Sequence, residues 1–524
     1  MNIKFKNFLI LIVCLMIIIS INLSVGASGS ADNKVLTIAL DEEIEGIDAH
    51  QVYWYDVVHS LIFETLLRFD LEVENVVPAL ASSLEITNEG KDLIFKIPKG
   101  LTFVNGDPLT IEDVKKSIDR YKEVSPYSED YASVQEVIVQ DGETIVFKCS
   151  EPPAYMWPAL CSVASGVVNT KVIEKVGDEA YNRNAIAYGP AMIEEWVQGS
   201  HITLKKNPNY LTYTPYFENK GPLNFDEMLI RFIPDAFTRF SEFLAGNIDI
   251  IWNIPQENIG EIENDENYQI FEGLQAGVCW IMVNHRNEPL NDLKVRRAVA
   301  LAINREEIKN ALDDRVKITY GMLSPSQISY SAEGEKQFKA ENAIDIEEAK
   351  KLLAEAGWED KSGDGILEKD NNSLTIWLAV PLDRAPIKSS APVIQAQLKK
   401  IGVELKLREY ETSYVKQLVR DHDYDLALRS YDWLDPSDLS YKFHTNSDIY
   451  SDPVLDKLLD EGMYIMDNKK RAEKYTEAQN QIFSQAVAIP LFIEIVYHGV
   501  QKDIKGVKFE KTGANMYLND AYRE

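Results

Sequence analysis

The chain has 524 residues and a formal net charge of −29, from 54 Lys and Arg against 83 Asp and Glu. This acidity argues against nucleic acid or an anionic membrane surface as a partner, because both require a cationic protein face. The length is sufficient for two or three domains.

Residues 1–27 have the composition of a secretory signal. Two lysines precede an apolar run from Phe8 to Ile19, and Val25-Gly26-Ala27 supplies small residues for cleavage after Ala27. An uncleaved membrane anchor is the alternative, because the 18 residues from Phe8 to Val25 are borderline for spanning a bilayer. Cys14 lies inside the run and follows Val13, not a small residue, so no lipid anchor is predicted.

Three cysteines follow the signal segment: Cys149, Cys161 and Cys279. An odd count in an exported protein leaves at least one thiol unpaired. Cys149 and Cys161 are candidates for a disulfide, but the sequence does not establish the required geometry. No cysteines have the spacing of metal ligands, so no structural zinc site is predicted.

The first elements are a strand over Val35 to Leu40 and a helix, indicated by apolar spacing, over Val58 to Phe69. Between them lie Tyr53, Trp54 and Tyr55. Three consecutive aromatic residues do not all face one core, so at least one is expected to face solvent or a cleft, with ordinary interface packing as the alternative.

Alternating strands dominate the next part of the chain, at residues 84–87, 93–97, 134–139 and 144–148. Leu93, Phe95 and Ile97 alternate with polar residues, and a turn follows at residues 105–108. Thr110 is then placed to cap a helix, with Asp113 as the acid of a capping box. This part is expected to form an α+β unit.

The segment from Leu93 to Tyr121 resembles the signature of the family 5 extracellular solute-binding proteins, the peptide- and nickel-binding components of ABC importers. The shared residues are Phe103, Gly106, Pro108-Leu109-Thr110, Asp113-Val114, Ser117 and Arg120. Further matches follow in the family's order up to about residue 500, including Gly246, Ile248 and Asp249, Val295-Arg296-Arg297-Ala298-Val299 and Ala302-Ile303-Asn304-Arg305. The chain departs from the pattern at Asn105, Tyr188 and Ala191.

The second half alternates helices and strands. A strand over Gly277 to Asn284 contains Trp280, and Asp345 caps a helix over Ile346 to Ala356 that Gly357 ends. The alternation over residues 374–407 suggests a mostly parallel sheet. Helices at 456–466 and 471–485 precede a strand at 488–496. The acidic turn at Asp360 to Gly365 lacks the bidentate Glu of a calcium loop and is interpreted as a polar turn.

The loop from Arg429 to Pro436 is the candidate ligand site, because it follows a strand at Tyr424 to Leu428 and ligands of open α/β sheets bind beyond strand ends. The resemblance implies that an Asp of this loop holds a peptide's ammonium, which leaves Asp432 and Asp435 both open. Arg429 suits a ligand carboxylate, and Tyr431 and Trp433 suit stacking. Tyr53, Trp54 and Trp280 complete the candidate set. The alternative is that Asp435-Pro436 only caps a turn.

The resemblance implies an α/β fold with two lobes, the type II periplasmic-binding-protein fold (cluster C-like), and an α+β domain inserted in the first lobe. The boundaries that it suggests are 28–58, 180–274 and 487–524 for the first lobe, 59–179 for the inserted domain and 275–486 for the second lobe. Two chain crossovers, near Cys279 and Pro490, are expected to form the hinge.

The implied function is that of an extracytoplasmic, monomeric binding component that delivers a short peptide to an ABC permease and its ATPase subunits. No catalytic residue, cofactor or metal site is predicted, since nucleophile-elbow, P-loop and His-Glu-x-x-His motifs are missing. Alternatives are a nickel or metal chelate, with His50, His59 and His444 as possible contributors, an oligosaccharide, or a sensor or chaperone role without transport.

Overall fold

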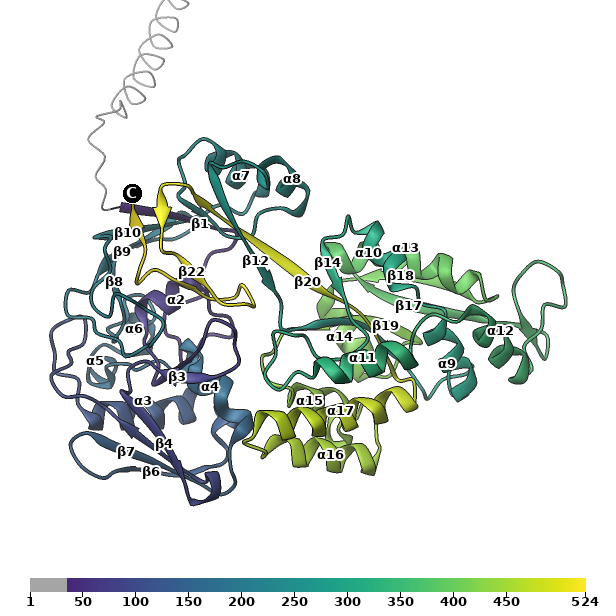
Figure 1. Ribbon diagram of the computed structural model, residues 1–524, viewed down its shortest axis with the longest axis horizontal. Helices are drawn as coiled ribbons and strands as arrows, with labels where there is room; N and C mark the ends of the chain where they lie inside the picture. Colours follow the sequence, from purple (N-terminus) through teal and green to yellow (C-terminus); the bar gives the residue numbers. More distant parts are fainter. Residues whose placement is uncertain (1–34) are drawn as a thin grey trace, which may run out of the picture.

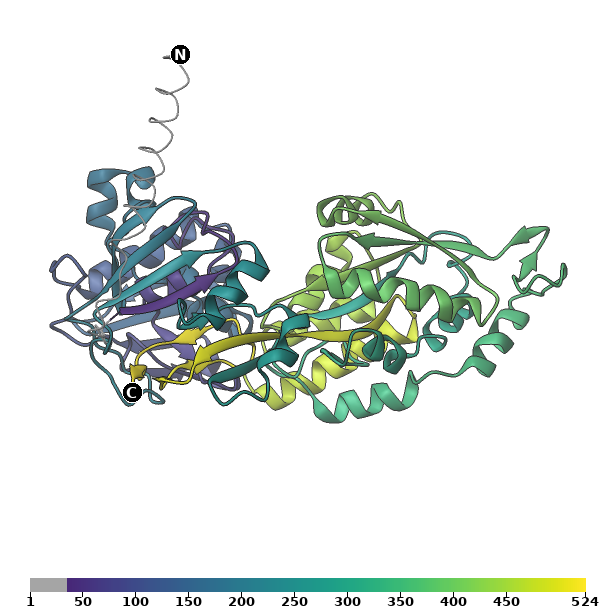
Figure 2. The same ribbon diagram turned by 90° about the horizontal axis from the view of Figure 1, so that it is seen from above.

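The computed structural model describes residues 35–524, so the predicted signal segment lies outside the described residues. Two bodies lie side by side and are joined by two neighbouring strands, β12 (Tyr268–Leu274) and β20 (Ala488–Gln501) (Figures 1 and 2). A single mixed sheet runs through both bodies in the order β18-β17-β19-β13-β20-β11-β1-β10-β9-β8. The fold is therefore two-lobed, with a sheet half in each lobe.

The first lobe is built on β1, whose sequence VLTIAL places apolar residues on both faces. This strand pairs in parallel with β10 and β11, and β9 and β8 extend the sheet in antiparallel fashion. The bounds are β1 (Val35–Leu40), β8 (Ala191–Val197), β9 (His201–Lys206), β10 (Glu227–Phe232), β11 (Ile250–Ile251), α2 (Val57–Ile62), α5 (Thr170–Val176), α6 (Asp178–Tyr181), α7 (Ala236–Leu244) and α8 (Ile259–Ile262).

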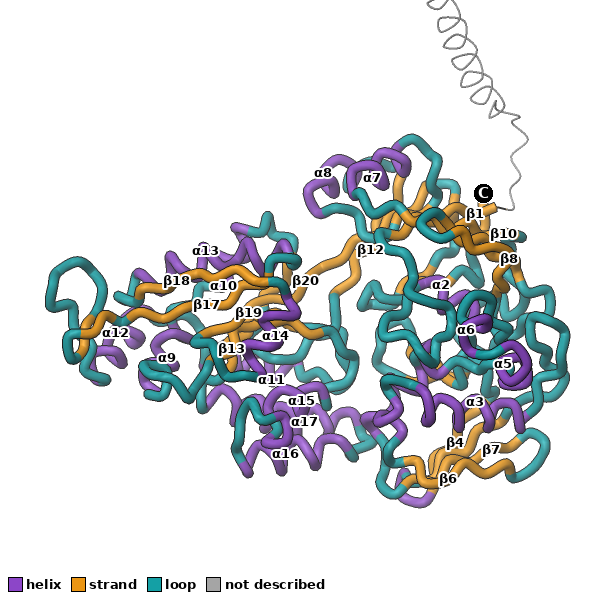
Figure 3. Tube along the Cα trace, turned by 180° about the vertical axis from the view of Figure 1, so that it is seen from behind, coloured by secondary structure: helices purple, strands orange, loops and turns teal. Residues whose placement is uncertain are grey.

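The inserted part of the first lobe is a four-stranded antiparallel sheet, ordered β4-β5-β7-β6, with α3 against it (Figure 3). Thr110 and Asp113 form the predicted capping box of α3. One face of that helix carries Val114, Ile118 and Tyr121 into the core with Phe95. The bounds are β2 (Leu67–Phe69), β3 (Val76–Pro78), β4 (Ser83–Thr87), β5 (Asp92–Lys96), α3 (Ile111–Val124), β6 (Val134–Val139), β7 (Thr144–Cys149) and α4 (Trp157–Cys161).

The second lobe has helices on both faces of its sheet half, with a separate apolar core on each face. β17 pairs in parallel with β18 and β19, whereas β13 is antiparallel to β19 and β20. The sheet is thus mixed, because β13 and β20 enter from the first lobe. The bounds are β13 (Val278–Val283), α9 (Leu293–Leu301), α10 (Arg305–Ala311), β14 (Val316–Ile318), α11 (Ala332–Glu341), α12 (Ile346–Glu355), β15 (Glu368–Lys369), β16 (Asn372–Ser373), β17 (Thr375–Pro381), α13 (Ala385–Lys399), β18 (Glu404–Tyr410), α14 (Thr412–Arg420), β19 (Leu426–Tyr431), α15 (Asp438–Phe443), α16 (Pro453–Met463) and α17 (Asn468–Ser484).

The two lobes are connected by β20 over its whole length. Residues Ala488 to Phe492 pair with β13 in the second lobe, and residues Ile495 to Gln501 pair with β12 in the first. The other connection is the short loop of residues 275–277 between β12 and β13. The chain ends in the first lobe with four two-residue strands, β21 (Ile504–Lys505), β22 (Lys508–Phe509), β23 (Met516–Tyr517) and β24 (Tyr522–Arg523).

The structure corrects the helix predicted for Val58 to Phe69. The helix ends at Ile62, and β2 begins at Leu67 and pairs with β3. The backbone N–H of Glu64 donates to the carbonyl of Tyr188, and the carbonyl of Glu64 accepts from Val167. These distant partners satisfy the backbone in an extended form, so apolar spacing alone overestimated the helix.

Candidate functional site

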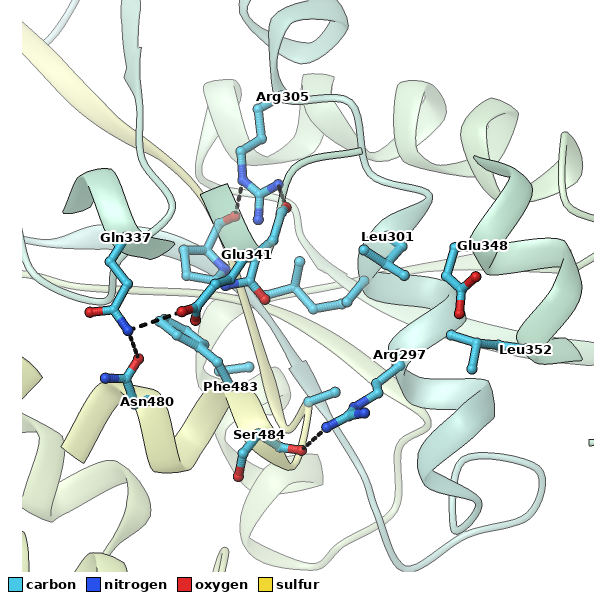
Figure 4. A pocket seen from close by; sticks show the side chains of 16 residues that line it. Arg297, Leu301, Arg305, Gln337, Glu341, Glu348, Leu352, Asn480, Phe483 and Ser484 are labelled. Atoms are coloured by element: carbon cyan, nitrogen blue, oxygen red, sulfur yellow. Dashed lines mark hydrogen bonds between the residues drawn. The ribbon is translucent and has the colours of Figure 1, made fainter. Parts of the chain in front are cut away.

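A cavity of about 550 Å³ lies wholly within the second lobe, between α9, α11, α17 and the start of β20 (Figure 4). Its polar side chains already have partners. Arg305 donates to the backbone carbonyls of Thr319, Pro490 and Asn342, and Arg297 donates to the Ser484 carbonyl. The protein's own backbone therefore already occupies donors of both guanidinium groups.

A second cavity, of about 420 Å³, lies between the lobes and is the better candidate. We call it the interlobe cavity. The first lobe contributes the aromatic loop before α2 and Tyr127, and the second lobe contributes the end of β19, the loop after it and one face of α14. Six of the eight predicted site residues line it: Tyr53, Trp54, Arg429, Tyr431, Asp432 and Trp433. Their contact with a ligand remains a prediction.

Asp432 is accessible from the interlobe cavity and lies beside the loop of residues 275–277 that precedes β13. The backbone N–H groups of Ala276 and Gly277 favour the charged form of its carboxylate. A side chain on residue 277 would overlap the carbonyl of Tyr431, so glycine is required for this close approach. Withdrawal from bulk water raises the pKa of Asp432, while Arg384 and the two N–H groups oppose the shift.

Arg429 is half-buried in the wall of the same cavity, and its guanidinium makes no hydrogen bond or ion pair with any residue from 35 to 524. Burial lowers the pKa of its guanidinium, and Arg420 adds to the effect. Arg384, which also lines the cavity, differs because it is paired with Glu494 at 2.7 Å. Buried charges are normally paired, so the guanidinium of Arg429 has capacity for an anion from outside the chain.

The aromatic residues lie on both sides of the interlobe cavity. Trp54 is 73% exposed and Tyr53 is 62% exposed, which leaves their rings free to cover a ligand. Across the cleft, the rings of Tyr127 and Trp433 approach to 6.1 Å between centroids. Because Tyr127 belongs to the inserted domain and Trp433 to the second lobe, this contact joins the lobes around the cavity.

Two of the predicted site residues do not face the cavity. Asp435 is fully buried, and its oxygens accept from Arg471 on α17 at 2.6 and 2.7 Å. Trp280 is 1% exposed and packs beneath the ammonium of Lys442, 4.6 Å from the ring centroid. Of the two aspartates left open by the sequence, only Asp432 is available to a ligand. Asp435 stabilises the loop through its ion pair with Arg471.

Several cavity residues were not predicted, namely Tyr55, Tyr127, Arg384 and Lys416. Arg384 follows β17, which is parallel to β19, so both strands end at the same sheet edge. The rule that ligands bind beyond the strand ends of open α/β sheets, which selected Arg429, therefore applied to Arg384 too. Tyr127 comes from the opposite lobe, and no local pattern marks it.

The histidines named for a metal chelate lie elsewhere. His50 and His59 are fully buried and bond the carbonyls of Gly166 and Gly46. Within residues 35–524 no group of three His, Cys, Asp or Glu side chains is arranged to hold a metal ion.

Cys149, Cys161 and Cys279 are free thiols. Among residues 35–524, no helix has the length and apolar character needed to cross a membrane.

Comparison with known proteins identifies the architecture. The family model "Bacterial extracellular solute-binding proteins, family 5 Middle" matches residues 75–451. The oligopeptide-binding protein AppA of Bacillus subtilis is 27% identical over 475 residues, which cover 86% of this chain and 84% of AppA. The probable D,D-dipeptide-binding periplasmic protein DdpA of Escherichia coli is 24% identical over 446 residues, which cover 82% of this chain and 81% of DdpA.

Solved structures show the same fold. The structure of Bacillus subtilis AppA in complex with a nonapeptide has a TM-score of 0.71 at 24% identity, covering 94% of this chain and 99% of AppA. NikA from Brucella suis in complex with Fe(III)-EDTA has a TM-score of 0.80 at 20% identity, covering 94% of this chain and all of that one. These two proteins hold different ligands on one architecture, so the fold alone does not select a ligand.

Proposed function

Because the chain belongs to the family 5 bacterial extracellular solute-binding proteins, we propose that it captures a short peptide between its lobes and delivers it to an ABC importer. The observation that favours a peptide as the ligand is the pair of opposite charges on one cavity wall, Asp432 and Arg429. A peptide has an ammonium at one end and a carboxylate at the other. Charge-assisted hydrogen bonds to both ends fix its orientation.

The same cavity explains how binding is linked to the shape of the molecule. Tyr53 and Trp54 contact the solute from the first lobe, and Arg429 and Asp432 contact it from the second. A solute that touches both walls binds the closed arrangement better than an open one and therefore shifts the population toward closure. The closed form then docks on the permease, and the solute is released without chemical change.

Export follows from the amino-terminal sequence. We infer that residues 1–27 direct secretion and are cleaved after Ala27, without a lipid anchor. The intact mass of the protein recovered from its producing cell distinguishes a chain that begins at Ser28 from one that keeps the apolar segment.

Native mass spectrometry of freshly purified protein tests the ligand class, and calorimetric titration with defined peptides tests the two charges. We expect a distribution of peptide masses on the native protein. Asp432→Asn and Arg429→Gln are each expected to weaken binding at least tenfold, since each removes one charge-assisted bond. Asp360→Asn, an exposed turn residue far along the chain from the cavity loop, is the matched control and is expected to bind normally.

An oligosaccharide is the second candidate, favoured by the aromatic rings that line the cavity, including Tyr53, Trp54 and Trp433. Such a ligand has no ammonium or carboxylate for Asp432 and Arg429. A sugar mass on the native protein, with affinity unchanged in the Asp432 and Arg429 variants, would replace the peptide by this candidate. A stoichiometric metal ion would contradict both.

A further inference from the structure

A smaller hollow of about 160 Å³ adjoins the interlobe cavity on the side of the first lobe. The two share Tyr55, Asp432 and Trp433, so Asp432 lies at their junction. We call the smaller hollow the first-lobe chamber. Its other walls include Phe69, Pro158, Cys161, Val163, Leu434 and Tyr517.

The charged groups around the first-lobe chamber already have partners inside the protein. Arg68 is paired with Glu64 at 2.9 Å, and its guanidinium lies 4.9 Å from the centroid of the Tyr517 ring. Glu510 accepts hydrogen bonds from Tyr517 at 2.6 Å and from Asn515 at 2.8 Å. With these groups occupied, the chamber offers a ligand mainly apolar and aromatic surface.

We propose that the first-lobe chamber receives the side chain of the ligand's first residue, and that the protein therefore selects peptides beginning with Leu, Met or Phe. This inference rests on the proposed function. An ammonium bound by Asp432 places the adjacent side chain at the chamber's mouth. The chamber is as large as apolar cavities of about 150 Å³ that bind benzene. A charged first side chain would have to displace the hydrogen bonds that Glu510 and Arg68 already make, and burying a charge without such partners is costly.

Calorimetric titration of the full chain with Leu-Ala-Ala, Ala-Ala-Ala and Lys-Ala-Ala tests the inference. Each buried methylene strengthens binding about fourfold, so Leu-Ala-Ala is expected to bind at least tenfold more tightly than Ala-Ala-Ala. Lys-Ala-Ala is expected to bind most weakly. Equal affinities for all three peptides would overturn the chamber assignment and leave the proposed function intact. Binding of none of them, nor of peptides recovered from the native protein, would overturn both.

Cys161, a free and half-buried thiol in the chamber wall, allows the pocket size to be changed. Cys161→Leu fills the chamber and is expected to reduce the preference for Leu over Ala at the first position at least fivefold. Cys161→Ala enlarges it and is expected to favour Phe-Ala-Ala. Cys149→Ala, which removes a buried thiol outside both cavities, is the control. The ratio between peptides is unaffected by partial misfolding, so an unchanged ratio in Cys161→Leu would refute the proposal.

Discussion

The ion pair behind the ligand loop gives the sharpest test of how this site is built. Asp435 and Arg471 are both fully buried, and they form two hydrogen bonds, of 2.6 and 2.7 Å. Asp435 also accepts from the backbone N–H of Ser437. Replacing Asp435 by Asn keeps the shape and one accepting oxygen but places an amide donor against a guanidinium donor.

The magnitude follows from the two bonds and the burial. A hydrogen bond to a charged group contributes about 1.5–3 kcal/mol, so two give about 3–6 kcal/mol. This range agrees with the loss of about 3–5 kcal/mol that accompanies removal of one partner from a buried pair. Arg471 keeps its bond to the Gly462 carbonyl, which limits the loss. We therefore expect Asp435→Asn to lower the free energy of unfolding by about 3–5 kcal/mol.

Urea-induced unfolding followed by tryptophan fluorescence measures the change, and peptide titration at low temperature measures affinity in the folded fraction. The double variant Asp435→Leu/Arg471→Met is expected to recover most of the loss, because apolar replacement of a whole buried pair is often neutral. Asp432→Asn should show the opposite pattern, with little change in stability and a large loss of affinity. If Asp435→Asn were stable within about 1 kcal/mol yet failed to bind peptide, the structural role assigned to Asp435 would be refuted.

Three further predictions concern the binding loop at Gly277 and the pH dependence of stability at Asp130 and His498. Gly277→Ala should weaken peptide binding tenfold or more in titration, because the new methyl group overlaps the Tyr431 carbonyl and displaces Asp432; unchanged binding would contradict this. Burial and the nearby Asp435 raise the pKa of Asp130 to about 7, so the folded state holds this proton more tightly than the unfolded state from about pH 4 to 7. Stability from this group falls as pH rises through that window, and Asp130→Asn should raise the urea midpoint at pH 8 but not at pH 4. Burial lowers the pKa of His498 to about 4, so its contribution is lost as pH falls from 6.5 to 4. His498→Gln should flatten the midpoint's decline over that range.

The helices and strands that could be predicted are those whose start, end or pattern is set by residues close together in the sequence. The box formed by Thr110 and Asp113 starts α3, and Asp345 with Gly357 bounds α12. A short apolar run located β1, and strand alternation located the sheet of the inserted domain. The order of these elements resembles one family along most of the chain, and that order implied the two-lobed architecture before any tertiary contact was known.

The sequence determined most of the helix and strand positions, because caps, turns and apolar periodicity act between neighbouring residues, although it extended α2 beyond Ile62. Its resemblance to one family implied the two-lobed fold and supported the candidate loop. The sequence did not decide which aspartate of that loop is free, since Asp435 is neutralised by Arg471, 36 residues later on α17. Nor did it reveal that Tyr127 of the inserted domain meets Trp433 across the cleft. Which side chains remain unpaired depends on partners supplied by distant segments, and only the folded protein brings those segments together.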